Sequence, residues 1–225
     1  MTDTKQMSES IPIYMILALS GGCMDAYSYL NRGRVFANAQ TGNMLLFGVN
    51  CADRNISDAL RYLWPVLAFA AGIMLSDLIR YKIQPKRLHW RQFSVILEMA
   101  VLFLVCWLPQ DLNSPANVLT SFVCGLQVES FRSVHGNAMA TTMCIGNLRS
   151  GTYYLGQYFQ NRNTAWIRKA ALYYGMILFF VLGAVAESFL IRLFAEKALL
   201  LSVSLLMTAF LLMLSHPDAP SPRRS

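Results

Sequence analysis

The chain has 225 residues, of which 55% are hydrophobic and only 14% are charged, and its net charge at neutral pH is +7. Soluble domains usually carry about 25% charged residues, so the charged fraction of this chain is low. Disordered chains contain few apolar residues, so the high apolar fraction excludes a disordered chain. The five cysteines are an odd number and several lie inside apolar runs, which argues against a secreted scaffold held by disulfides.

Six apolar segments follow one another along the chain, each close to the roughly 20 residues that a helix needs to cross a bilayer. A single such segment could be a buried core helix, but six leave too little polar sequence to cover a soluble core. The sequence therefore predicts an all-α polytopic membrane protein with one membrane domain over residues 1–225 and an exposed tail at 215–225. The six segments are Ile11–Leu30, Tyr62–Arg80, Gln92–Leu108, Leu112–Val128, Ala170–Leu190 and Ala198–Leu214.

The basic residues predict how the chain is oriented. Residues Arg80–Arg91 hold five Lys or Arg and no acid, whereas Gln92–Phe131 holds neither Lys nor Arg. Short loops rich in Lys and Arg stay in the cytoplasm, so this loop and both chain termini are expected there. A nucleic-acid patch is the alternative for the basic loop, but a short turn between membrane helices suits it poorly, and we expect no nucleic-acid partner.

The two halves of the chain resemble each other, with repeat 1 over about 11–108 and repeat 2 over about 115–214. Each half also contains an F-x-x-G motif, Phe69–Gly72 and Phe180–Gly183. Shared hydrophobicity alone does not produce glycines, acids and Gly-Asn pairs in one register, so we predict a duplication. The matched residues are Gly21 with Gly125, Asp25 with Glu129, and Thr41-Gly42-Asn43 with Ile145-Gly146-Asn147.

Each half contains one segment rich in Asn, Gln, Thr and Gly, at Val35–Ala52 and Ser133–Gly156. Such backbone is tolerated at membrane depth only inside protein or beside a water-filled cavity. If each segment dips in and returns, the chain has six transmembrane helices as two inverted three-helix repeats. If each segment spans the bilayer instead, the halves are parallel and there are eight helices; the Lys and Arg distribution favours six.

Residues Gly21–Asn43 read GG-x-x-DA-x-SYL-x-x-G-x-VFA-x-AQTGN, which resembles the signature of the YoaK family of bacterial inner-membrane proteins. The resemblance extends over nearly the whole chain and implies a six-helix protein of the bacterial inner membrane with an undetermined function. It implies no catalytic residues. Ile145 replaces Thr41 in the second copy, so any symmetry of role is already imperfect.

Asp25 and Glu129 lie well inside apolar segments, where an ionised Asp costs about 2.5–3.5 kcal/mol at the bilayer centre. They are expected to form a proton or cation site, or a buried ion pair with Arg132 or Arg149. The alternative is that each acid reaches the interface from a helix end.

The Gly-Asn segments supply the other candidate residues. Thr or Asn could cap half-helices at Met44–Val49 and Leu148–Tyr154, whose free N–H groups could bind an anion or a carboxylate. Tight packing through small residues is the alternative. The site residues expected beside the two acids are Gln40, Thr41, Gly42, Asn43, Gly146, Asn147 and Arg149.

No metal-binding spacing, nucleotide loop or hydrolase motif occurs, so we expect no cofactor, no metal and no enzymatic activity. The function expected from these residues is that of a secondary transporter or permease for a small solute or ion. The protein is expected to lie in the lipid bilayer, and an oligomer is compatible with this role. Two alternatives stay open: a membrane-embedded enzyme that uses an acid pair, and a non-catalytic assembly partner.

Overall fold

The computed structural model describes residues 8, 10–82, 89–134, 137–138 and 141–215, and these residues are predominantly helical. The only strands in this described part are β1 (Ser133–Val134) and β2 (Asn137–Ala138), which pair antiparallel. Two short 3₁₀ helices, η2 (Gln110–Leu112) and η3 (Ala195–Leu199), precede α5 and α8. The α-helices are α1 (Ile11–Asn31), α2 (Gln40–Ala52), α3 (Ile56–Lys82), α4 (Trp90–Val105), α5 (Asn113–Ser130), α6 (Cys144–Asn161), α7 (Thr164–Phe194) and α8 (Leu200–Ser215).

Each of the six apolar segments coincides with one long helix, namely α1, α3, α4, α5, α7 and α8. The two Gly-Asn segments form the separate helices α2 and α6. Helix α7 begins earlier than the apolar run because the Asn163 side chain caps it by accepting a hydrogen bond from the Ala165 backbone. The predicted tail at 215–225, apart from Ser215, and the centre of the basic loop lie outside the described residues.

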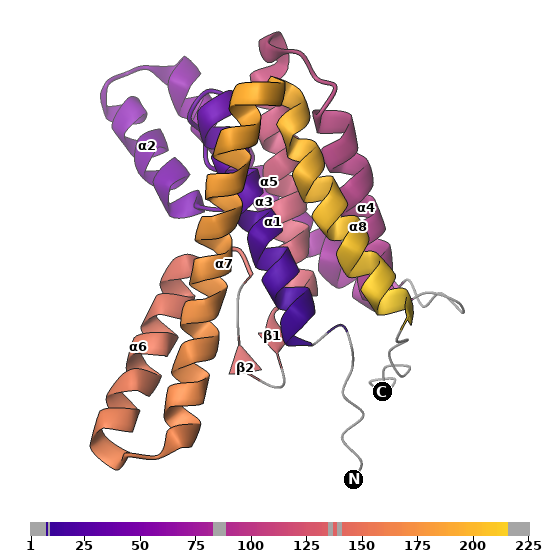
Figure 1. The fold of residues 1–225 in the computed structure, drawn as a ribbon. Coiled ribbons are helices and arrows are strands. Elements are labelled where there is room, and N and C mark those ends of the chain that lie inside the picture. The colour runs from indigo at the N-terminus through magenta and orange to yellow at the C-terminus, as the bar shows by residue number, and fades with distance from the viewer. Residues whose placement is uncertain (1–7, 9, 83–88, 135–136, 139–140, 216–225) are drawn as a thin grey trace.

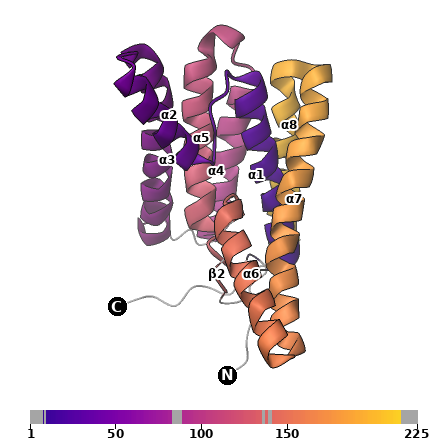
Figure 2. The same ribbon diagram turned by 90° about the vertical axis from the view of Figure 1, so that its left-hand side faces the viewer.

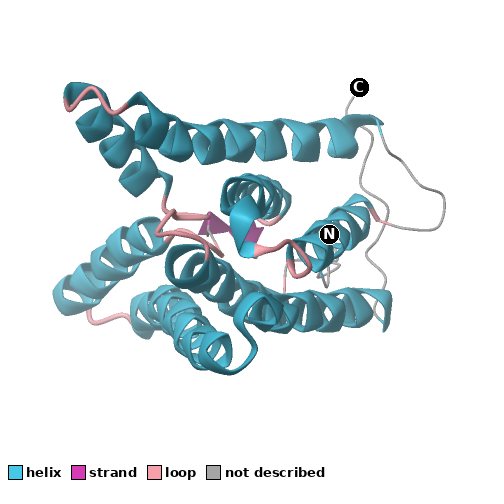
Figure 3. Cartoon of the chain, turned by 90° about the horizontal axis from the view of Figure 1, so that it is seen from above, coloured by secondary structure: helices cyan, strands magenta, loops and turns pink. Residues whose placement is uncertain are grey.

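The six long helices form one bundle, with α2 beside its upper half and α6 beside the lower part of α7 (Figures 1 and 2). Helix α1 packs along α7 and α8, α5 packs along α3 and α4, and α4 packs on α8. Seen from above, the short strand pair projects near the middle of the helices (Figure 3). The α6–α7 hairpin extends beyond the lower end of the other helices.

Two closely packed helix crossings hold this bundle together. At the α1–α7 crossing, a β-carbon on Gly22 would collide with the Phe180 carbonyl, and one on Gly183 with the Leu19 carbonyl. The α3–α5 crossing repeats this arrangement through Gly72 and Gly125, which face the carbonyls of Phe122 and Phe69. Glycine is needed at all four positions because the backbones themselves are in contact. Both F-x-x-G motifs of the sequence therefore lie at helix crossings.

Two helical stretches, Ile56–Lys82 and Thr164–Ser215, are long and apolar enough to cross a membrane. The second comprises α7, η3 and α8. Core helices of soluble proteins can pass the same test of length and composition, so by itself this is weak evidence for a membrane protein.

Candidate functional site

The chain reverses direction immediately after α1 and returns along that helix. The Asn38 side chain donates a hydrogen bond of 3.0 Å to the Gly21 carbonyl, and its backbone N–H donates one of 2.7 Å to the Asp25 carboxylate. The backbone N–H groups of Ala37 and Ala39 interact with the same carboxylate. Gly21 lies ten residues, about 15 Å, before the end of α1, so the returning chain reaches roughly halfway down the helix. We call this point of the returning chain, at Asn38, the first tip.

Asn43 and Gln40 hold the first tip closed. The Asn43 amide donates to the Phe36 carbonyl and to Gln40 Oε1, while its own Oδ1 accepts from the Phe36 backbone. Gln40 in turn donates to the Ala37 carbonyl. The expectation that Thr or Asn caps a half-helix is wrong for α2, because its N-cap is Ala39 without a side-chain cap and Asn43 lies inside the first turn. The Asn43 side chain turns back and fastens the preceding loop instead.

The segment that precedes α6 approaches the middle of α1 from the opposite end of that helix. We call the end of this segment, at Thr141 and Thr142, the second tip. Ser133 lies level with Tyr14, whose hydroxyl donates to the Ser133 carbonyl and accepts from its N–H. Thr142 lies level with Gly21, close enough that its methyl group would be 2.9 Å from an added β-carbon there. Between Ser133 and Thr142 the chain has therefore moved about two helical turns toward the middle of α1.

Gln127 of α5 fastens the second tip. Its amide donates to the Leu17 carbonyl of α1 and to the Thr141 hydroxyl, both at 3.1 Å. Three buried oxygens in this region accept no hydrogen bond from any described residue: Asn38 Oδ1, Gln127 Oε1 and Thr142 Oγ1. The two tips thus meet at one level of α1. We call this place the tip junction, formed by Gly21, Asp25, Asn38, Gln127, Thr141 and Thr142.

The predicted site residues fall into two groups. Asp25 belongs to the tip junction, and Gln40, Asn43 and Asn147 are buried in the first turns of α2 and α6. Thr41, Gly146 and Arg149 are exposed, Gly42 packs against the Phe36 ring, and Arg149 forms no ion pair with any described residue. At α6 the N-cap is Met143, again without a side-chain cap, so the capping expectation is wrong there too.

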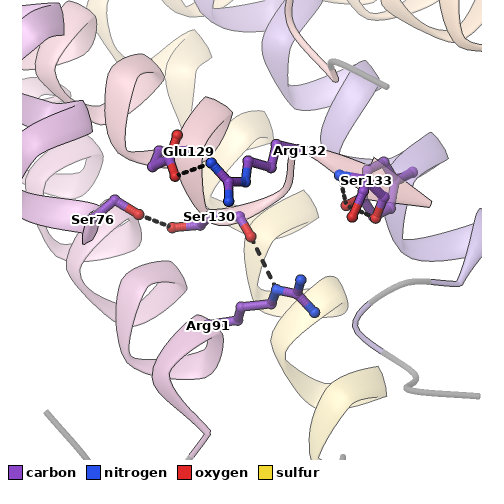
Figure 4. A network of polar contacts seen from close by, with 7 residues as sticks. Ser76, Arg91, Glu129, Ser130, Arg132 and Ser133 are labelled. Atoms are coloured by element: carbon purple, nitrogen blue, oxygen red, sulfur yellow. Dashed lines mark hydrogen bonds and ion pairs between the residues drawn. The ribbon is translucent and has the colours of Figure 1, made fainter. Parts of the chain in front are cut away.

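Glu129 lies apart from Asp25, next to the last residue of α5. Its carboxylate pairs with Arg132 at 2.9 Å, which is one of the two ion pairs anticipated for it (Figure 4). The pair is partly solvated, since 18% of Glu129 and 58% of Arg132 is exposed. Neighbouring Ser130 exchanges a hydrogen bond with Ser76 and accepts one from Arg91 through its carbonyl. Glu129 is therefore part of a polar group at the end of α5, and no described contact joins it to Asp25.

Two acids that the sequence gave little reason to choose are buried more completely than either candidate. Glu98 of α4 and Glu187 of α7 have no exposed surface, and neither oxygen of either carboxyl has a hydrogen-bond partner among the described residues. Each occurs once in a long apolar segment, as Asp77 does, yet Asp77 is exposed. Sequence alone does not say which face of a helix an acid occupies. The crossing glycines mark the buried face of each helix. Glu187 lies one turn after Gly183 on the same face, so this register would have predicted that Glu187 is buried in the bundle.

A fully buried arginine closes the upper end of the bundle. Arg32 donates to the carbonyls of Val105, the last residue of α4, and of Leu108 and Pro109 just after it, and also to the Tyr27 hydroxyl. The C-terminal end of a helix presents free carbonyls and a partial negative charge, which a guanidinium satisfies. On the same face, the backbone N–H of Glu196 and the Gln110 amide hold the pKa of the Glu196 carboxyl below its usual value.

The described residues contain no group of three or more His, Cys, Asp or Glu side chains that could hold a metal ion. The tip junction combines amide, hydroxyl and carboxylate oxygens and backbone carbonyls with the N–H donors of Asn38 and Gln127.

Comparison with known proteins identifies a family. Residues 13–212 match a family model described as protein of unknown function, DUF1275. No curated protein and no solved structure matches the chain.

Proposed function

Since the chain belongs to DUF1275, a family of proteins of unknown function, we propose its role from its own architecture: it is a secondary transporter or permease that moves a small solute or ion across a membrane. It would do so without chemical conversion of that solute. The bilayer, the repeat and the tip junction each contribute one step to this proposal.

Membrane insertion is supported by the inverted placement of polar and apolar side chains. Large apolar residues are exposed along the outer faces of the long helices, whereas the buried set includes two unpaired glutamates and a fully buried arginine. A water-soluble protein rarely exposes so many large apolar side chains along its long helices, because burying them is the main driving force of folding. In a bilayer the same surface faces lipid. Examples are Trp64, Leu67 and Met74 on α3, Leu178, Leu182 and Phe189 on α7, and Met207 and Leu211 on α8.

Six spans in two inverted repeats account for the way the helices pair. Helix α1 packs on α7 and α8, and α5 packs on α3 and α4, as expected if α1, α3 and α4 correspond to α5, α7 and α8. The two glycine crossings correspond under the same relation. Helices α2 and α6 also correspond, each preceded by a loop that returns to the middle of the bundle. Three spans in each half make the halves antiparallel, the arrangement of many secondary transporters.

The orientation follows from charge at the two ends. The lower end carries more bases than acids, whereas the upper end, including the start of α3, mixes both. The lower-end residues are Arg80, Lys82, Arg132, Arg162, Arg168 and Lys169 against Asp77 and Glu129, and the upper-end residues are Arg34, Arg54 and Arg61 against Asp53, Asp58 and Asp111. Cytoplasmic loops hold the excess of Lys and Arg. We therefore place the lower end, and with it both termini, on the cytoplasmic side of a bacterial inner membrane.

The tip junction is the observation that carries the transport proposal. Helices α2 and α6 begin near one another and run in opposite directions, and the polar segments before them both contact Gly21. Transporters place solute sites where broken helices meet near the bilayer midplane, because the polar backbone there needs partners that lipid cannot offer. Asp25 and Gln127 fasten the two tips, so release of either tip would open the junction toward one side.

Accessibility of the two helix starts tests the proposal. Single cysteines at Ala39 and Met143, both exposed N-cap positions, are introduced into a chain whose native cysteines are replaced by serine. Alternating access predicts that a membrane-impermeant maleimide reacts with each of them from either face of sealed vesicles. Leu67→Cys on the lipid-facing side of α3 is the matched control and should react from neither face. Reaction of both tip cysteines from only one face, or from neither, would refute transport through the junction.

A further inference from the structure

Two carboxyl groups in the core of the bundle have no described partner. Glu98 lies on α4 and Glu187 on α7, and both are fully buried. None of their four oxygens has a hydrogen-bond partner in the part of the chain that the structure describes. Asp25, by contrast, accepts backbone hydrogen bonds, and Glu129 pairs with Arg132. The four acids therefore divide into two that are satisfied as anions and two that are not.

Glu98 lies close to the tip junction. The thiol of Cys124 on α5 interacts electrostatically with both Glu98 and Asp25, and is placed near the Asn38 side chain. Helix α8, which also packs on α4, has no titratable side chain, and α3 faces the start of α4 through Arg80 and Trp90. Arg91 is two turns away on α4 and is engaged with Ser130 and Ser8. Among the described residues, the groups facing Glu98 thus include a thiol but no cation.

Glu187 lies one turn after the glycine of the α1–α7 crossing. Its titratable neighbours are the thiols of Cys23 on α1 and Cys106 after α4. Helix α8 contributes Ser202, which donates to the Ser20 carbonyl, while Glu196 and Lys197 lie beyond the end of α7. Arg192, the nearest arginine along α7, is exposed.

At the α3–α5 glycine crossing, the position that corresponds to Glu187 is occupied by a hydrogen-bonded serine. Ser76 lies one turn after Gly72 on α3 and exchanges a hydrogen bond of 2.9 Å with Ser130 on α5. Glu187 occupies the corresponding place after Gly183, but it has no such partner. A carboxyl group is thus present where a serine pair would have satisfied the packing. Packing alone does not account for it.

An unpaired carboxylate is very costly in a dry interior, so such a group exists there as a neutral acid or with a bound cation. Among the described residues, neither glutamate belongs to a group of three or more His, Cys, Asp or Glu side chains that could hold a metal ion. We propose that Glu98 and Glu187 are proton-binding sites, each holding one proton at neutral pH as a carboxylic acid. Each releases that proton to water, leaving a carboxylate, when movement of the helices admits solvent.

This inference deepens the proposed function and rests on it in one respect. If the chain is a secondary transporter, the two protons are the coupling ions, and the transport cycle exchanges them with the two sides in turn. The protonation itself does not depend on transport, because it follows from burial in the closed conformation. The two ideas can therefore be tested separately.

Infrared spectroscopy of the full-length protein in lipid bilayers tests the protonation. We expect a carboxylic-acid C=O band at neutral pH that shifts in D₂O, loses part of its intensity in Glu98→Gln and in Glu187→Gln, and disappears in the double variant. Glu196→Gln, which removes a partly exposed acid of η3, is the control and should leave the band unchanged. Reaction of the wild-type protein with dicyclohexylcarbodiimide, which modifies protonated buried carboxyls, should add adducts at Glu98 and Glu187 and needs no variant.

Absence of both the band and the adducts at neutral pH would overturn the proposal. So would suppression of the band by Na⁺ or K⁺ at constant pH, because a bound cation would then satisfy the carboxylates. Alternating accessibility without these protonation signals would refute the proton sites alone. The protonation signals without alternating accessibility would refute the proposed transport while leaving the two sites in place.

Discussion

Gly22 of α1 and Phe180 of α7 lie in backbone contact, so that a β-carbon on Gly22 would overlap the Phe180 carbonyl oxygen. The partner at such a contact is backbone rather than a flexible side chain, so it cannot move aside without displacing a helix. The α3–α5 crossing has the same property at Gly72. Close approach of two helices through glycine is a common device in membranes, where packing replaces the hydrophobic effect between helices.

Gly22→Ala should destabilise the protein by about 1–3 kcal/mol or more, as overpacking of a tight core does. Gly175→Ala is the matched control, since Gly175 lies in a helix of the same crossing with no atom within 4 Å of an added β-carbon. It should be neutral or stabilising by up to about 1 kcal/mol, because alanine favours helix. Thermal unfolding of the detergent-purified variants measures both. Equal midpoints for the two variants would contradict the crossing geometry.

The sequence predicted the positions of the long helices because each apolar run is long and ends at polar or charged residues. It also placed the Gly-Asn segments between the long apolar helices, where α2 and α6 lie. It did not predict the partner of Asp25, because the hydrogen bond from Asn38 depends on where the returning loop stops. Equally, the match between Asp25 and Glu129 in sequence did not carry over to their surroundings, since one faces a tip and the other a helix end.

Asn43→Ala should loosen the first tip. The change removes two donated hydrogen bonds and one accepted one, and it leaves the Phe36 backbone groups without those partners, at a cost of about 1–3 kcal/mol. Thr41→Ala, two residues earlier on the exposed face of α2, should change stability by less than about 0.5 kcal/mol. Thermal unfolding compares the two, and proteolysis of the 32–39 loop reports local opening. Similar effects for both variants would mean that Asn43 does not hold the tip.

Arg32→Lys should destabilise the upper end of the bundle despite keeping the charge. A lysine cannot reach the three carbonyls at the C-terminal end of α4 and the Tyr27 hydroxyl together, because it lacks the planar fork of the guanidinium. We expect a loss of about 2–4 kcal/mol, since buried polar groups would lose their partners. Arg168→Lys, at an exposed position of α7, should have almost no effect on the unfolding midpoint. A stable Arg32→Lys protein would show that these contacts are dispensable.

Cys51 offers a direct test of orientation. It is the only exposed thiol among the five cysteines, and it lies near the C-terminal end of α2 at the upper end of the bundle. In intact cells a membrane-impermeant maleimide should therefore label the protein, and Cys51→Ser should abolish most of the label. A cysteine at Asn163, in the α6–α7 turn of the lower end, should be labelled only in inverted vesicles when introduced into the Cys51→Ser chain. The reverse pattern would place the basic end outside, and labelling of both positions from one face would rule out the six-span arrangement.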